Sequence, residues 1–205
     1  GVRVRGVPTP AAAPRAARTV ATVSSPPLSQ IVEHVILVSD NEGAEVLAHH
    51  VGLSVLDDGS FAAGAQGVRR TLAGLGVPLD GAVIRDGSGL SRQNRLRADT
   101  LLEVLRVAAD RPDLRAVLTG LPVGGFTGSL MFRFDQAPPA GVGRVRAKTG
   151  SLGRVRSLAG IATDQSGTPM VFVLAADRIR VRDTVDAEQD LDNLAGALGA
   201  CRCSR

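Results

Sequence analysis

The sequence contains 205 residues, and 44% of them are apolar, which suffices for one sizeable hydrophobic core. No uncharged apolar run approaches the roughly 18 residues that a membrane-spanning helix requires, so no membrane span is predicted. The net charge of +4 invites a nucleic-acid partner, but no tryptophan or tyrosine is present to stack on bases and acidic residues are spread among the arginines, so we rank this function last.

The first 23 residues have the composition of a linker. A short alternating piece, Val2 to Val7, precedes a stretch rich in proline, alanine and arginine that shows little periodicity. No secretory signal pattern is present, so either the chain is not exported or its natural start lies upstream. We interpret residues 1–23 as the end of a preceding accessory region and residues 24–205 as the main domain.

Two amphipathic helices follow, separated by a polar triplet. Ser24-Ser25-Pro26-Pro27 predicts the start of the first helix, and apolar residues at helical spacing continue it to position 36. Apolar residues between positions 44 and 51 predict the second helix, closed by Gly52. The triplet Ser39-Asp40-Asn41 therefore lies at a rigid helix junction, from which side chains can point into a cleft.

The middle of the chain predicts two more helices and two loops. Residues 60–75 form a third helix, weakened by its glycines, and residues 101–108 form a fourth that ends before Pro112. A short strand from Ala82 to Ile84 and a turn-rich loop over residues 86–92 lie between them. A long irregular segment from Leu121 to Gly143 carries consecutive prolines at 138 and 139, and loops of this length are often functional rims or disordered.

The last third predicts an antiparallel sheet and a closing helix. Alternating residues around Gly150 and Gly153 predict a hairpin connected through these glycines. Its second arm runs to Thr163, and the apolar run at residues 170–176 predicts a third strand. Residues 183–198 form an amphipathic helix ended by Gly199. This order of elements predicts an α+β domain with helices packed on an antiparallel sheet.

The two cysteines, Cys201 and Cys203, are one residue apart near the carboxyl end. They are too few to ligate zinc, and the sequence leaves open whether they form a strained mutual disulfide, pair elsewhere or stay free. We expect no metal and no cofactor.

Lys148 is the only lysine of the chain, and every other basic side chain is arginine. A compact ammonium differs chemically from a planar guanidinium, so we infer a specific role for Lys148. If Ser39-Asp40-Asn41 and Lys148-Thr149-Gly150 met across a cleft, Ser39 could pass a proton and Asn41 could donate its amide to a substrate carbonyl. Lys148 and the Thr149 hydroxyl could then hold a carboxylate.

The next residues of this stretch suit a bound backbone. Gly150 would let a substrate lie close along the strand, and the N–H of Ser151 could face a developing oxyanion. Lys148 and Thr149 point to opposite faces of a regular strand, so a ligand that uses both has to lie along the strand edge.

In this order, the two tripeptides resemble the active-site signature of penicillin-binding proteins and serine β-lactamases. Neighbouring segments strengthen the match, and the five segments are Ser25-Pro26-Pro27-Leu28, Ser39-Asp40-Asn41-Glu42, residues 86–92, Gly128-Ser129-Leu130 with Arg133-Phe134, and Lys148-Thr149-Gly150-Ser151-Leu152. Over roughly residues 24–200 the chain resembles the D-alanyl-D-alanine carboxypeptidase/endopeptidase group of low-molecular-mass class C penicillin-binding proteins.

The resemblance implies the penicillin-binding protein/serine β-lactamase-like transpeptidase fold and an exported enzyme that trims peptidoglycan stem peptides outside the cytoplasmic membrane. Catalysis would pass through an acyl-enzyme on serine, which β-lactam inhibitors also form. It further implies catalytic roles for Ser39, Asn41 and Lys148 and substrate-binding roles for Thr149 and Ser151, with Gly150 as the close-approach residue.

The chain departs from the family pattern at the nucleophile. The family uses the serine of a Ser-x-x-Lys motif, but with Lys148 as the only lysine, position 145 is valine and the motif is absent. We therefore predict that residues 24–205 form the carboxyl-terminal part of the catalytic domain, that the nucleophile lies on a missing amino-terminal segment, and that this segment is the partner that completes the site.

Two other functions stay open. A catalytically inactive homologue would keep the fold and the affinity for the cell wall. A β-lactamase needs a group that activates water for deacylation, and because no acidic residue can be assigned to that role we rank this function lower.

Overall fold

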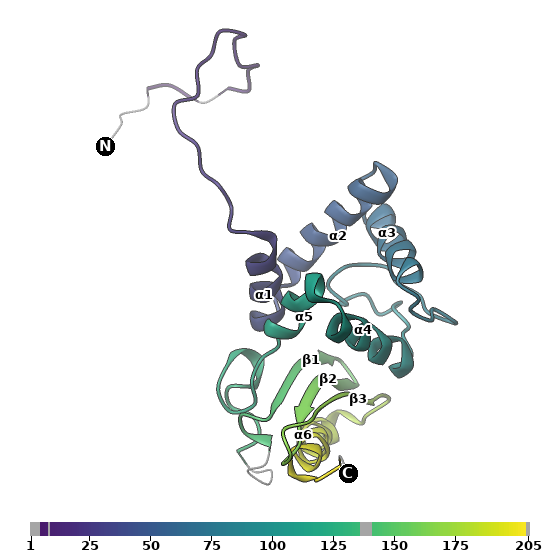
Figure 1. The fold of residues 1–205 in the computed structure, drawn as a ribbon. Coiled ribbons are helices and arrows are strands. Elements are labelled where there is room, and N and C mark those ends of the chain that lie inside the picture. Colours follow the sequence, from purple (N-terminus) through teal and green to yellow (C-terminus); the bar gives the residue numbers. More distant parts are fainter. Residues whose placement is uncertain (1–4, 8, 136–140, 204–205) are drawn as a thin grey trace.

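The computed structural model describes residues 5–7, 9–135 and 141–203 (Figure 1). Part of the predicted alternating piece, Val2 to Val7, and the prolines at 138 and 139 lie outside these residues. Residues 5–7 form no strand, and residues 9–27 lead away from the folded part as exposed chain without helix or strand (Figure 1). The assignment of residues 1–23 to a preceding accessory region stays a prediction.

The described residues form one antiparallel sheet, with the strand order β1 (Val145–Leu152), β2 (Val155–Thr163), β3 (Pro169–Ala176). This confirms the three predicted strands. The expectation that Gly150 belongs to the hairpin connection was wrong, because the turn contains Gly153, at φ 54°, while Gly150 lies inside β1. Gly150 faces Ser157 of β2, whose hydroxyl would overlap any side chain at position 150.

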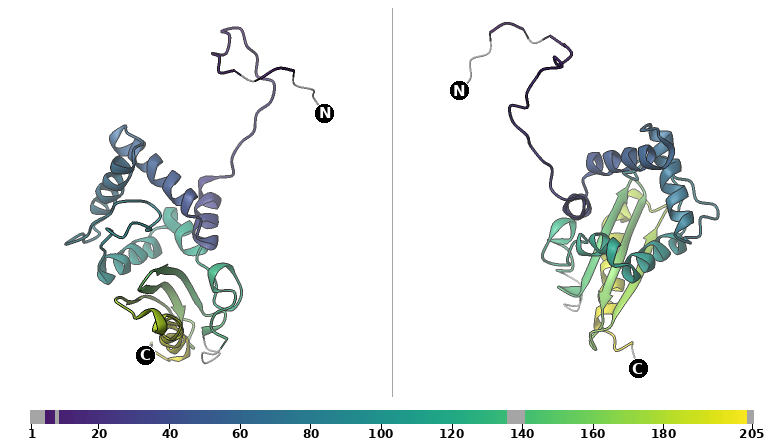
Figure 2. Two further views of the ribbon diagram at one scale, coloured as in Figure 1. Left: turned by 180° about the vertical axis from the view of Figure 1, so that it is seen from behind. Right: turned by 45° about the horizontal axis from the view of Figure 1, so that its top comes forward.

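Helices cover the sheet from two sides, as Figures 1 and 2 show. The helices that precede the sheet are α1 (Leu28–Val38), α2 (Asn41–Leu56), α3 (Phe61–Gly74), α4 (Ala98–Asp110) and the short α5 (Arg115–Thr119). The helix that follows it is α6 (Thr184–Ala200), which packs across all three strands, whereas α4 contacts β3 and β2. The predicted α+β class with helices packed on an antiparallel sheet is confirmed.

Glycine positions explain where the helix predictions went wrong. α2 does not end at Gly52 but runs on to Leu56. Gly52 instead lies where α2 packs directly on α3. A Cβ at position 52 would lie 2.7 Å from the backbone nitrogen of Gly64, so the small residue serves helix packing and not helix termination. The predicted strand from Ala82 to Ile84 is reduced to a single bridge between Val83 and Arg95.

Part of the segment from Leu121 to Gly143 packs into the core. Leu130 and Phe134 belong to the main core, with exposed fractions of 0% and 1%. Arg133 forms a bidentate ion pair with Asp192 of α6, at 3.0 and 2.7 Å. These contacts fix the segment against α6, and the short 3-10 turn Gly128–Leu130 packs against β1 and the end of α1.

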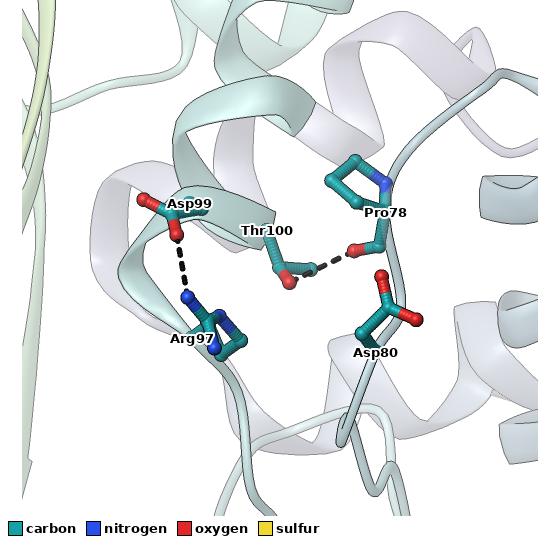
Figure 3. Close-up of a pocket in the computed structure, with 5 residues that line it drawn as sticks. All are labelled: Pro78, Asp80, Arg97, Asp99 and Thr100. Atoms are coloured by element: carbon teal, nitrogen blue, oxygen red, sulfur yellow. Dashed lines mark hydrogen bonds and ion pairs between the residues drawn. The ribbon is translucent and has the colours of Figure 1, made fainter.

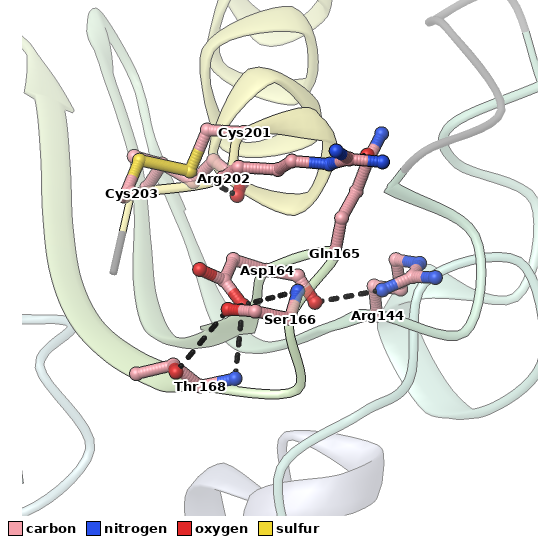
Figure 4. Close-up of a disulfide and its surroundings, with 9 residues drawn as sticks. Arg144, Asp164, Gln165, Ser166, Thr168, Cys201, Arg202 and Cys203 are labelled. Atoms are coloured by element: carbon pink, nitrogen blue, oxygen red, sulfur yellow. Dashed lines mark hydrogen bonds between the residues drawn. A yellow bond between two sulfur atoms is a disulfide. The ribbon is translucent and has the colours of Figure 1, made fainter. Parts of the chain in front are cut away.

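The carboxyl end closes on the turn between β2 and β3, as Figure 4 shows. Cys201 and Cys203 form a disulfide with each other, which answers the question that the sequence left open. The carbonyl of Cys201 accepts a hydrogen bond from the Gln165 N–H at 3.0 Å. Beside it, the buried carboxylate of Asp164 accepts the N–H groups of Ser166 and Thr168, which ties the turn together.

Candidate active site

Ser39 caps the carboxyl end of α1, directly after Val38, and adopts the left-handed conformation, with φ 58° and ψ 48°. Its N–H and that of Asp40 both bond to the carbonyl of Val35, and the Asp40 carboxylate then accepts the N–H of Gly43 at 2.9 Å to begin α2. A left-handed non-glycine residue costs about 1–2 kcal/mol, which the two flanking helices offset here. The triplet lies at a junction between two helices, as predicted, and the structure directs the Ser39 hydroxyl toward Lys148 of β1.

Lys148 meets Ser39 from the opposite side of the site. Its ammonium donates to the Ser39 hydroxyl oxygen at 2.7 Å and to the carbonyl of Thr149 at 3.0 Å. Burial lowers the pKa of Lys148 below its ordinary value of 10.5. Among the described residues no carboxylate forms an ion pair with it, so its charge is available to an anion or to a proton transfer through Ser39.

Alternation along β1 separates Lys148 from Thr149. Val145 and Ala147 are buried in the core with residues of α6, so Thr149 lies on the same face and Lys148 lies on the other. The Thr149 hydroxyl donates to the hydroxyl of Ser129 at 2.9 Å. The two neighbouring residues of the tripeptide therefore reach the strand edge from opposite faces, as the predicted edge-bound ligand requires.

The outer edge of β1 is half covered. The carbonyl of Val145 accepts from Gly124 and the N–H of Ala147 donates to Pro122, both at 2.9 Å. Because every second residue of an edge strand turns its backbone outward, the N–H groups of Thr149 and Ser151 face the same side. No backbone hydrogen bond within the described part of the chain joins a loop to them, so this half of the edge is open to a ligand strand.

The structure places Ser129 beside Thr149, which the sequence analysis did not anticipate. Its segment, Gly128-Ser129-Leu130, entered only as part of the family resemblance and received no role. Gly128 has a φ of 55°, and a side chain at this position would overlap the carbonyl oxygen of Leu37 in α1. Glycine thus lets the turn approach the last turn of α1, which places Ser129 beside Thr149.

Asn41 is the first residue of α2 and is exposed. It lies two residues beyond Ser39, and no hydrogen bond joins its side chain to Ser39 or Lys148 among the described residues. It borders an open hollow of about 420 Å³. The other lining residues are Glu42, Glu45, Phe61, Asp86, Ser88 and Leu90.

The loop of residues 86–92 is held beside Asn41 by two carboxylates. Glu45 of α2 accepts the N–H groups of Gly87 and Ser88 at 2.9 and 3.0 Å. Burial raises the pKa of Glu45, but hydrogen bonds from the Ser88 side chain and from these N–H groups outweigh it, so the pKa lies below 4.5. Asp86 organises the loop from within by accepting the N–H of Ser91 at 2.6 Å.

A second hollow, of about 300 Å³, lies at the start of α4 and is lined by Pro78, Asp80, Arg97, Asp99 and Thr100 (Figure 3). Arg97 pairs with Asp99 at 3.0 Å, and the Thr100 hydroxyl donates to the carbonyl of Pro78 at 2.9 Å. None of the residues that the sequence singled out lines it. Across the described parts of the chain, no group of three His, Cys, Asp or Glu side chains could hold a metal ion, and no helix has the length and apolar character to cross a bilayer.

The family model for the D-Ala-D-Ala carboxypeptidase 3 (S13) family matches residues 1–198. Carboxypeptidase Rv3627c of Mycobacterium tuberculosis is 36% identical over 201 residues, which are 95% of this chain and 42% of that protein. Carboxypeptidase DacB of Mycolicibacterium smegmatis is 37% identical over 195 residues, which are 92% of this chain and 41% of that protein. The chain thus spans about two fifths of the length of these curated relatives.

Solved structures show the same fold. Penicillin binding protein 4 (dacB) of Haemophilus influenzae superposes with a TM-score of 0.75 at 27% identity, over 85% of this chain and 40% of that one. The same protein in complex with a β-lactam gives a TM-score of 0.71 at 30% identity, over 82% of this chain and 41% of that one. These neighbours confirm the predicted penicillin-binding protein-like fold.

Proposed function

Because the chain belongs to the D-Ala-D-Ala carboxypeptidase 3 (S13) family, we propose that it forms the carboxyl-terminal part of a serine D,D-carboxypeptidase/endopeptidase. The enzyme would hydrolyse peptidoglycan stem peptides and be acylated by β-lactams. The observation that carries this proposal is the 2.7 Å contact between the Lys148 ammonium and the Ser39 hydroxyl, across the junction between helices and sheet. It is supported by curated relatives named as carboxypeptidases and by a solved relative bound to a β-lactam.

In this proposal Ser39 and Lys148 form the proton-transfer part of the site. The hydroxyl of Ser39 accepts a hydrogen bond from Lys148 and can pass a proton to the leaving amine of the scissile peptide, while the nearby ammonium stabilises the developing negative charge. Asn41 directs its amide to the substrate carbonyl from the start of α2. The nucleophile itself belongs to a Ser-x-x-Lys segment outside this chain, because Lys148 is the only lysine here.

The substrate backbone would lie along the open half of the β1 edge. The terminal carboxylate of the substrate would accept a hydrogen bond from Thr149. The substrate backbone can approach β1 closely because position 150 is glycine. The outward N–H of Ser151 then lies where the scissile carbonyl develops its oxyanion. Such an arrangement uses both faces of the strand at once, which reconciles Lys148 and Thr149 with one ligand.

Because its proposed substrate is peptidoglycan, the enzyme would act outside the cytoplasmic membrane, where peptidoglycan is assembled. Its partners would be stem peptides, β-lactams and the amino-terminal segment that completes the site. The proposed chemistry involves no metal and no cofactor, since hydroxyl, amide and ammonium groups supply the proton transfer and charge stabilisation.

A non-catalytic protein that binds peptidoglycan is the second candidate, favoured by the lack of a Ser-x-x-Lys motif in these residues. Covalent labelling with a fluorescent penicillin separates the two. We expect no adduct on the 205-residue chain and a stoichiometric adduct on the longer polypeptide that includes its upstream segment, detected by intact mass. An adduct on this chain alone would place the nucleophile within it, and no adduct on the longer polypeptide would favour the binding protein.

A further inference from the structure

We propose that Ser129 is a second hydroxyl of the carboxylate-binding site, which grips the terminal carboxylate of the ligand together with Thr149. This inference deepens the proposed function and rests on it for the kind of ligand, a peptide that ends in a free carboxylate. The two hydroxyl oxygens are 2.9 Å apart, on β1 and on the 3-10 turn Gly128–Leu130.

The hydrogen-bond donors and acceptors of the two hydroxyls leave Ser129 able to donate to a ligand. Thr149 donates its proton to Ser129, so the proton of Ser129 needs an acceptor of its own. Ser129 is exposed, and among the described residues its hydroxyl has no hydrogen-bond partner other than Thr149. Ser129, and not Thr149, is therefore the hydroxyl of the pair that can donate a hydrogen bond to an anion bound at the strand edge.

A carboxylate fits this pair because it accepts several hydrogen bonds through two oxygens. Each hydroxyl can rotate to donate to one oxygen, or Ser129 can donate while Thr149 supports it, and either arrangement polarises the donor further. Hydrogen bonds to a charged acceptor are about twice as strong as neutral ones, so the second hydroxyl adds to affinity for an acid more than for a neutral amide.

Two contacts hold Ser129 in place from either side. Gly128 meets the carbonyl of Leu37 at the end of α1, an approach that a larger residue would block. Four residues after Ser129, the Arg133 side chain is pinned to Asp192 of α6, and these two side chains are 12% and 5% exposed. The hydroxyl is thus carried by a packed turn, which limits the entropy lost when a ligand binds.

The test compares binding of an acyl-D-Ala-D-Ala peptide with that of the same peptide ending in an amide. Because we expect the 205-residue chain to lack a nucleophile, binding can be measured at equilibrium by calorimetry without turnover. We expect Ser129→Ala to weaken binding of the acid about ten-fold while binding of the amide changes less than two-fold, and Ser129→Thr to restore it. Ser54→Ala, at an exposed serine of α2, is the matched control and should change neither.

The results separate this inference from the proposed function. Equal losses for acid and amide, no loss for either, or no binding of the acid by the unaltered chain would each overturn the role of Ser129. Penicillin labelling of the longer polypeptide tests the enzymatic function on its own. An acid-selective loss in Ser129→Ala without any penicillin adduct would support carboxylate binding and reject the D,D-peptidase.

Discussion

The ammonium of Lys148 lies 2.7 Å from the hydroxyl of Ser39, a residue 109 positions earlier in the chain that ends α1 in the left-handed conformation. At this contact α1 meets β1 through a polar pair, whereas α4 and α6 pack directly on the strands. The half-buried ammonium has no carboxylate partner among the described residues. A group that is costly to bury and yet placed against a hydroxyl is arranged for chemistry rather than for stability.

Replacing Lys148 should reveal this cost as a dependence of stability on pH. The folded pKa of Lys148 is lowered from 10.5, so between the folded and unfolded pKa values the unfolded state binds more protons. The penalty of burying the charge is present in full below the folded pKa and is relieved as pH rises toward the unfolded value. The free energy of unfolding of the unaltered chain should therefore rise relative to that of Lys148→Met over this range.

Denaturant unfolding between neutral pH and pH near 10.5 measures the effect. Lys148→Arg is the matched control, because a guanidinium stays charged throughout and should show no such rise against Lys148→Met. We expect both variants to lose activity in the longer polypeptide. A constant difference between the unaltered chain and Lys148→Met across this range would contradict the lowered pKa.

Gly128→Ala should destabilise the fold and weaken ligand binding together. Position 128 has a φ of 55°, which costs about 1–2 kcal/mol for a residue with a side chain, and the new methyl group would overlap the carbonyl of Leu37. We expect a total loss of roughly 3 kcal/mol in the free energy of unfolding. Gly76→Ala is the matched control, because Gly76 has a φ of 81° with no atom near its absent side chain, so it should lose only the conformational part.

Chemical denaturation of these two variants isolates the effect of the close approach. Equal losses in both would show that the turn can move away from α1 without penalty. Weaker binding of the acid peptide in Gly128→Ala alone would show that the position of Ser129 depends on this approach.

Breaking the pair between Arg133 and Asp192 should cost far more than breaking a surface pair. The two side chains are 12% and 5% exposed, and removing one partner leaves the other charge buried without compensation. We expect Arg133→Ala to lower the free energy of unfolding by about 3 kcal/mol. The loss in the double variant with Asp192→Ala should be much smaller than the sum of the single losses.

Arg111→Ala is the control, since its partner Asp113 is 61% exposed and its removal should leave stability unchanged within error. A similarly small effect of Arg133→Ala would show that the segment is held by Leu130 and Phe134 alone. Additive losses in the double variant would show that the pair does not couple.

Periodicity and order along the chain predicted the five longer helices, the three strands and the helix junction that holds Ser39, but not the short α5. These features follow from local patterns that one segment carries by itself, such as alternation in β1 and β2. The unusual count of one lysine was enough to single out Lys148, and the structure places it against Ser39. This contact forms because the end of α1 and strand β1, both predicted from local patterns, pack against each other.

The features that the sequence reasoning missed depend on contacts between distant segments. Gly52 follows a run of helical residues and looked like a helix end, but the backbone of α3 packs against it. The role of Ser129 depends on Gly128 meeting α1 and on Arg133 meeting Asp192, a partner 59 positions away. The periodicity of a single segment cannot reveal contacts of this kind. The Gly128-Ser129-Leu130 segment, which contributed to the family resemblance, was the feature of the sequence that could have pointed to Ser129.

Glu45→Gln should loosen the loop that faces Asn41. The carboxylate of Glu45 accepts the N–H groups of Gly87 and Ser88 with its two oxygens, and a glutamine keeps only one acceptor for them. We expect hydrogen-exchange protection of these two amides to fall several-fold at neutral pH. Glu42→Gln, at an exposed neighbour whose side chain forms no hydrogen bond within the described parts of the chain, should leave the protection unchanged.

The effect of Glu45→Gln should disappear in acid. The pKa of Glu45 is lowered below 4.5, so its stabilisation of the loop is present above that value and is lost as pH falls through the folded pKa. Protection of Gly87 and Ser88, corrected for the intrinsic exchange rate at each pH, should therefore converge between the unaltered chain and the variant at low pH. A difference that persists under acid conditions would show that the loop responds to the shape of the side chain and not to its charge. Since this loop borders the hollow beside Asn41, a loosened loop should also slow penicillin acylation of the longer polypeptide, which fluorescent labelling can follow over time.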